Sequence, residues 1–120
     1  MPRAWSVLSA DSSGQYAVPP HTVFALTISA KSPQAPLLVS GFQQMLADKQ
    51  VTGTAFNPGQ PAPADWPPLA MDPTHDATDC YRFLGRVSDA GPVRISSGLY
   101  GADLQFPVRV FTSPVFAGFS

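Results

Sequence analysis

The densest group of reactive side chains lies at residues 75–80, where His75, Asp76, Asp79 and Cys80 come together in the sequence. Thiolate and imidazole are the usual ligands of structural zinc, at fixed spacing. Here there is one cysteine with one nearby histidine, and the second histidine, His21, is distant in the chain. We therefore predict no metal site and no cofactor. We interpret Asp76 and Asp79 as turn residues before a strand.

Cys80 and a histidine could also form a thiol nucleophile with its base. Such a cysteine needs a lowered pKa and a base within hydrogen-bond reach. A buried structural cysteine at the start of a strand explains the pattern more simply. The phosphate-binding, zinc-protease and serine-hydrolase motifs are absent, and the Asp residues offer no facing pair for glycosidic chemistry. We predict a protein without catalytic residues that is not an enzyme.

Alternating side chains predict the strands that position these residues. Phe24, Leu26 and Ile28 recur every second residue, which puts them on one face of a strand at 22–30. The segment 92–112 alternates on both sides of a glycine-containing reversal and predicts a β-hairpin. Its second strand is expected to lie at a sheet edge or to be bulged at Pro107, because Pro107 cannot donate to a ladder. Further strands are predicted at 4–8, 16–18, 37–40 and 80–87, and an edge strand is predicted at 52–56.

The composition argues against helices. All eight acids are Asp, Lys occurs only at positions 31 and 49, and there are 14 prolines. Long charged side chains favour helix surfaces, whereas an interior proline costs a helix about 3 kcal/mol. The only helical spacing is Phe42, Met45, Leu46 and Lys49. We predict an all-β fold, a β-sandwich or jelly-roll-like barrel with a long Pro-rich loop. The alternative is a small α+β domain with one short helix at 41–49.

The length of 120 residues fits one domain. We predict a single β-rich domain over 1–120, with an extended Pro-rich arm at 57–79 and an aromatic tail at 113–120. No stretch resembles a signal peptide or approaches the roughly 20 apolar residues of a spanning helix. We expect a soluble protein that has no signal peptide and no membrane partner. The compartment stays open, with a virion as one candidate.

The charges are few, at 12% of residues, against 44% hydrophobic residues. The segment 48–80 is acidic and the segment 81–120 is basic. The four arginines of the basic segment are too dispersed for a nucleic-acid footprint, which needs a clustered basic face. Large apolar surfaces on small proteins usually have partners. We therefore expect a protein partner, either a second copy or a larger protein assembly.

The Pro-rich arm, the last strand and the tail supply the residues for such a contact. Pro presets extended backbone, so the arm can lie ordered on a surface at reduced entropic cost. The alternative is that the arm and the tail pack on their own domain, with Trp66 capping the core. The predicted interface consists of Trp66, Leu69, Met71, Arg109, Phe116 and Phe119.

The first functional hypothesis is a non-enzymatic structural or assembly protein that oligomerises or docks on a larger assembly. Low charge, a compact β module and a Pro-rich arm suit a virus or phage particle component, such as a capsid cement or tail protein. The second hypothesis is a monomeric peptide- or sugar-binding β module with Trp66 and Tyr100 as its platform. The third is a small enzyme that uses the cluster from His75 to Cys80.

Overall fold

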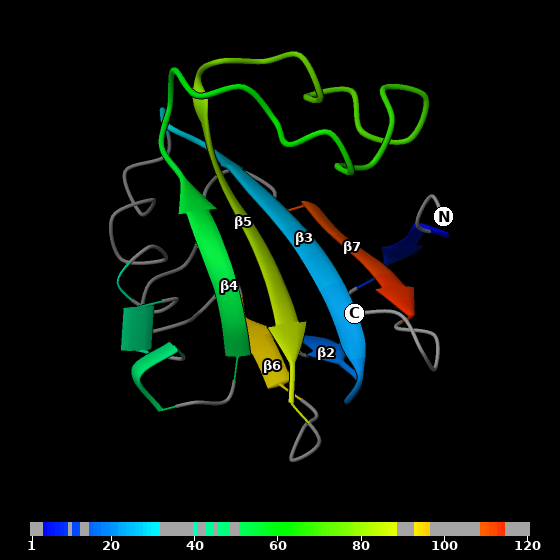
Figure 1. The fold of residues 1–120 in the computed structure, drawn as a ribbon. Coiled ribbons are helices and arrows are strands. Elements are labelled where there is room, and N and C mark those ends of the chain that lie inside the picture. Colours follow the sequence, from blue (N-terminus) through cyan, green and yellow to red (C-terminus); the bar gives the residue numbers. More distant parts are fainter. Residues whose placement is uncertain are drawn as a thin grey trace.

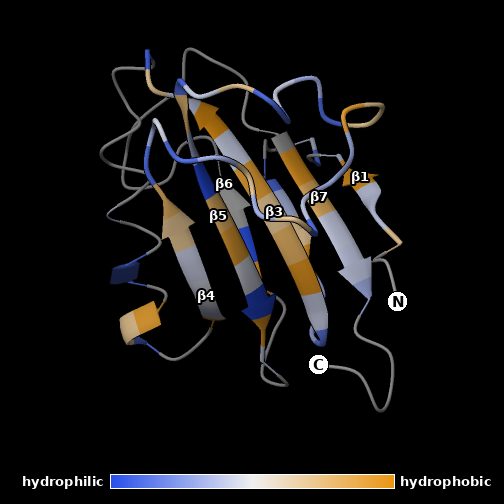
Figure 2. Ribbon diagram, turned by 45° about the horizontal axis from the view of Figure 1, so that its top comes forward, coloured by the Kyte–Doolittle hydropathy of each residue, from blue (hydrophilic) through white to orange (hydrophobic). Residues whose placement is uncertain are grey.

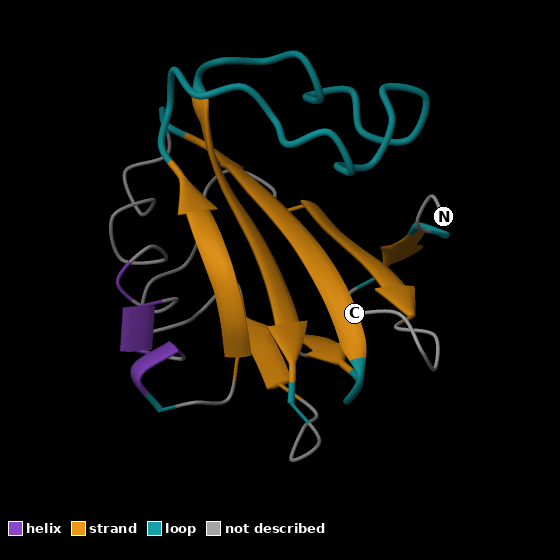
Figure 3. Cartoon of the chain, in the orientation of Figure 1, coloured by secondary structure: helices purple, strands orange, loops and turns teal. Residues whose placement is uncertain are grey.

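The computed structural model describes residues 4–9, 11–12, 15–31, 40, 43–44, 46–48, 51–88, 93–96 and 109–114. These residues are mostly strand, with one short helical stretch at 40, 43–44 and 46–47 (Figure 3). The strands are β1 (Ser6–Leu8), β2 (Gln15–Val18), β3 (Thr22–Ser29), β4 (Val51–Phe56), β5 (Cys80–Val87), β6 (Val93–Ser96) and β7 (Arg109–Pro114). Strands are the main regular structure, which is compatible with the predicted all-β fold.

The strands form two antiparallel sheets (Figure 1). The large sheet has the order β1-β7-β3-β5-β4, and the small sheet pairs β2 with β6. All of the strand pairs are antiparallel. The chain therefore passes between the sheets twice within its first thirty residues, from β1 in the large sheet to β2 and back to β3.

The main core lies between the two sheets, on the side of the large sheet that we call the core face. Phe24, Leu26 and Ile28 of β3 are buried there, as the alternation predicts. Phe24 packs against Phe83 of β5, with ring centroids 5.6 Å apart. The same cluster contains Val18 and Val93 from the small sheet, so these apolar side chains hold the two sheets together.

The helical prediction at 41–49 is confirmed where the structure describes it. Gln43, Gln44, Leu46 and Ala47 are helical, and the amide of Asp48 donates to the carbonyl of Gln44 at 2.9 Å. Leu46 packs against the main core. Gln43, Gln44 and Ala47 are exposed, so among the described helical residues Leu46 alone contributes to the core.

The β-hairpin predicted at 92–112 is wrong in its pairing. β6 pairs with β2 in the small sheet, whereas β7 pairs with β3 and β1 in the large sheet. The alternation of apolar side chains shows which residues share a face of a strand, but it does not show which strand lies beside it. β3 is buried on both faces from Thr22 to Ile28, which favours a central strand with a neighbour on each side.

The predicted edge is also wrong. The last strand is flanked by β3 and, over Val110–Thr112, by β1, so it lies inside the large sheet. The edges of that sheet are β1 and β4, and the expectation that 52–56 returns as an edge strand is confirmed. Leu104, Phe106 and Pro107 of the predicted hairpin lie outside the described residues. So does the predicted strand at 37–40, except for Ser40, which is helical and not part of a strand.

Candidate functional site

The segment 57–79, which we call the Pro-rich loop, leaves the end of β4, crosses the large sheet toward β1 and returns to β5 (Figure 1). It covers part of the sheet side opposite the core face, which we call the loop face. Trp66 is buried there at 3% exposure, in a second cluster with Ala25 and Phe111. The indole N–H of Trp5 donates to the carbonyl of Asp65 at 3.0 Å, which ties the loop to the start of the chain. The Pro-rich loop therefore packs on its own sheet.

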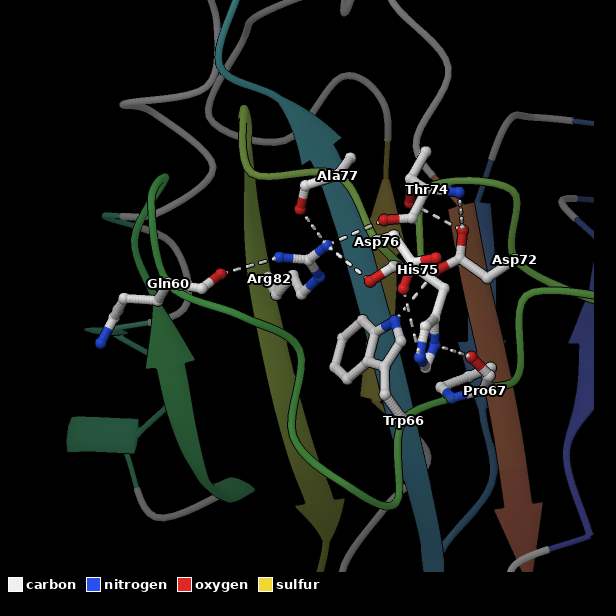
Figure 4. Close-up of polar contacts among 9 residues, drawn as sticks. All are labelled: Gln60, Trp66, Pro67, Asp72, Thr74, His75, Asp76, Ala77 and Arg82. Atoms are coloured by element: carbon white, nitrogen blue, oxygen red, sulfur yellow. Dashed lines mark hydrogen bonds and ion pairs between the residues drawn. The ribbon is translucent and has the colours of Figure 1, made fainter.

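Arg82 is the residue around which the Pro-rich loop is organised. It stands on the loop face of β5, opposite Thr27 of β3, and is only 2% exposed. Its guanidinium reaches both halves of the loop (Figure 4). Nη1 donates to the carbonyl of Gln60 at 3.2 Å, and Nη2 donates to those of Thr74, His75 and Ala77 at 2.8, 3.2 and 2.5 Å.

The guanidinium of Arg82 also lies over an aromatic ring. Its Cζ is 5.9 Å from the ring centroid of Trp66, within the range of a cation–π contact. Nε of Arg82 is buried without a hydrogen-bond partner. A buried charge normally requires full pairing. Here carbonyl dipoles and an aromatic face supply most of the compensation, and the role that follows is to fix the loop.

Asp72 is a second buried charged residue, and it belongs to the loop itself, where it has no exposed surface. Its Oδ2 accepts the indole N–H of Trp66 at 2.8 Å. Its Oδ1 accepts the backbone N–H of Thr74 at 2.9 Å and the hydroxyl at 2.7 Å. The carboxylate therefore closes the turn after residue 72 and sets the orientation of the indole.

His75 lies at the surface of the same network. Its Nδ1 is 2.7 Å from the carbonyl oxygen of Pro67, and since a carbonyl only accepts, Nδ1 carries the proton. Nε2 is 3.9 Å from a carboxylate oxygen of the exposed Asp76. Both side chains border a hollow of about 170 Å³ lined by Pro61, Ala62, His75, Asp76, Ala77 and Thr78. This volume holds a few water molecules or a very small ligand.

Cys80 is buried at the start of β5, opposite Ser29. Desolvation raises the pKa of its thiol, the nearby Arg82 lowers it, and Asp79 and Asp72 raise it further, so that the net direction is upward. A nucleophilic cysteine needs the opposite shift. The Nδ1 of His75 is already engaged by a backbone carbonyl. The geometry therefore favours the neutral, structural thiol.

Among the residues that the structure describes, no three His, Cys, Asp or Glu side chains lie close enough together to hold a metal ion. No helix among them is long and apolar enough to cross a membrane. The hydrogen bonds of Asp72, His75 and Arg82 join loop residues to one another and to the backbone, which is typical of a structural network.

The predicted interface residues have three different environments. Trp66 is buried within the chain, Met71 is half-buried beside it, and Leu69 is 54% exposed. Arg109 begins β7, where its backbone is opposite Thr27. Phe116, Phe119 and the proposed platform residue Tyr100 lie outside the described residues. The structure thus brings Trp66 and Met71 together and leaves Leu69 at the surface.

Sequence reasoning missed Arg82 and Asp72 as the centre of the loop. The alternation along β5 places Arg82 on the face opposite Phe83, which is correct, but such a face normally meets solvent. The only sequence signal was the lack of any Lys or Arg between Lys49 and Arg82.

Comparison of the chain with protein-family models, with curated proteins and with solved structures finds no match.

Proposed function

We propose that this chain is a non-enzymatic structural module, a sandwich of its two β-sheets, that oligomerises or docks on a larger protein assembly. A component of a virus or phage particle, such as a capsid cement or tail protein, is the assembly that its low charge and Pro-rich loop suit best. The support comes from the surface that the loop presents.

The observation that carries the proposal is the turn at 68–71. Pro68, Leu69 and Ala70 are exposed and Met71 is half-buried, so four consecutive apolar residues form a short stretch of the loop surface. Figure 2 shows this hydrophobic stretch on the side of the sheet where β1 lies. An exposed apolar stretch of this kind suits contact with a protein partner.

The base of the turn is rigid, which makes it suitable for binding. Its first anchor, Trp66, is buried, and the amides of Met71 and Asp72 donate to the carbonyl of Pro68 at 2.9 and 2.8 Å. The Arg82 network then holds the following residues. A contact surface whose conformation exists before binding loses less entropy when the partner arrives.

A test compares the solution mass of the wild type with that of Leu69→Ser by light scattering. We expect an oligomer that Leu69→Ser weakens, because a serine removes the exposed apolar side chain without touching Trp66. Val7→Ser is the matched control, since Val7 is 65% exposed on a different element, β1. A wild type that is monomeric at all concentrations and binds no other particle protein would contradict the proposal.

A further inference from the structure

The open edge of the large sheet is the second surface that the fold leaves available. β4 is the last strand in the order of that sheet, and among the described strands it pairs with β5 alone. Every second residue of such a strand directs its N–H and C=O away from the sheet. Val51 is buried in the main core, whereas Thr52, Gly53, Thr54 and Ala55 are all exposed.

Exposure of Gly53 shows that the backbone itself is accessible, because a glycine has no other surface. The side of Gly53 toward β5 is filled: a Cβ there would meet Phe83 and the backbone of Leu84 and Gly85. Thr52 to Ala55 are exposed together with Gly53, so among the residues that the structure describes nothing covers this edge of β4.

β4 lacks the devices by which proteins protect a sheet edge. Charged side chains, prolines, bulges and very short length are the usual ones. The sequence Val-Thr-Gly-Thr-Ala-Phe contains no charge and no proline. The other described edge strands are protected: β1 has three residues, β6 carries the exposed Arg94, and Pro19 follows β2. β4 is the longest of these edges and the least protected.

We propose that β4 pairs antiparallel with β4 of a second copy, which joins the two large sheets into one continuous sheet across a twofold axis. This inference rests on the proposed assembly function and names its partner and surface. Pairing of this kind satisfies the outward N–H and C=O groups of both copies. Because this pairing leaves no free β4 edge on either copy, the assembly stops at a dimer.

The occupant is a second copy because the strand is complementary to itself. A twofold perpendicular to the sheet keeps each side chain on its own face, so opposing residues must share a face. A centre at Thr54 pairs Thr54 with its own copy, and a centre at Gly53 pairs Thr52 with Thr54. Both registers bring threonines together, a favourable cross-strand pair, and neither opposes like charges.

The test uses a double variant, Thr52→Lys with Thr54→Lys, in the full chain. In both registers it places lysines directly opposite one another across the axis, which should raise the dimer dissociation constant at least about tenfold. Both positions are exposed, so circular dichroism should show an unchanged fold. Ser12→Lys with Ala17→Lys is the control of equal charge, at exposed positions outside the large sheet.

Charge reversal makes the test specific to this strand. Thr52→Glu with Thr54→Glu should also be monomeric alone, and an equimolar mixture with the lysine variant should recover the dimer. Sedimentation velocity from micromolar to millimolar protein measures both. A wild type that stays monomeric, or a dimer that both variants leave intact, overturns the inference. A dimer that responds only to Leu69→Ser overturns it while the proposed function stands.

Discussion

Replacement of Arg82 by methionine should loosen the Pro-rich loop more than it disturbs the two sheets. Methionine fills much of the volume on the loop face but donates no hydrogen bond. The four carbonyl oxygens that the guanidinium binds then lose their donor. Two of these bonds, to Thr74 and Ala77, are short, whereas those to Gln60 and His75 are 3.2 Å long.

The magnitude follows from those bonds. A buried acceptor that loses its partner costs about 1–3 kcal/mol, and water can reach the carbonyl of the exposed Gln60. The loss of one buried charge with an unpartnered Nε partly offsets this cost. We expect Arg82→Met to lower the free energy of unfolding by about 2–4 kcal/mol, out of the roughly 5–15 kcal/mol typical of a domain.

Two assays measure the effect. Urea unfolding followed by tryptophan fluorescence gives the free energy. Chymotrypsin reports on the loop, where Leu69 and Met71 are its expected sites, because Pro67 blocks cleavage after Trp66. Trypsin has no site there, because residues 57–79 contain no Lys or Arg. Loop cleavage should accelerate at least about tenfold, since local opening becomes easier.

Matched variants separate the role of the branched guanidinium of Arg82 from that of its positive charge. Arg82→Lys keeps the charge but has a single nitrogen, so it cannot serve Gln60 and Thr74 from separate donors, and it should fall between wild type and Arg82→Met. Arg94→Met, at an exposed position, is the control and should change little. Unchanged urea midpoints and cleavage rates in Arg82→Met would refute this account of the loop.

Further variants address Asp72 and Cys80. Asp72→Asn turns an amide donor toward the indole N–H of Trp66 or toward Thr74 and should cost about 1–3 kcal/mol in urea unfolding, whereas Asp76→Asn at the surface should cost little. For Cys80, the raised pKa means that its stabilising contribution is complete below the ordinary thiol pKa and is lost as pH rises through the folded value. Cys80→Ala should therefore lose less stability than wild type between neutral and alkaline pH; equal losses would contradict the shift.

The strands were largely predictable because their signal is local. Alternation along β3 and β5 gives both the elements and their faces, and Phe24 and Phe83 meet in the core as that pattern requires. The spacing of Phe42 to Lys49 likewise predicts the one helical stretch. These features depend on neighbours a few residues apart, which a sequence displays directly.

The pairing of strands was not predictable in the same way. β6 and β7 are close in sequence, yet they join different sheets, because β3 needs a neighbour on each side and β2 requires a partner of its own. The burial of Arg82 has a similar origin. Nothing near it in sequence shows that a loop beginning more than twenty residues earlier folds back over its side chain.

Hydrogen exchange of the wild-type chain, compared between dilute and concentrated solution, tests the assembly role most directly. We expect amides of β4 and of the 68–71 turn to exchange more slowly when the protein is concentrated, while those of β3 and β5 are unchanged. Exchange in β4 and in that turn that is independent of protein concentration would contradict it.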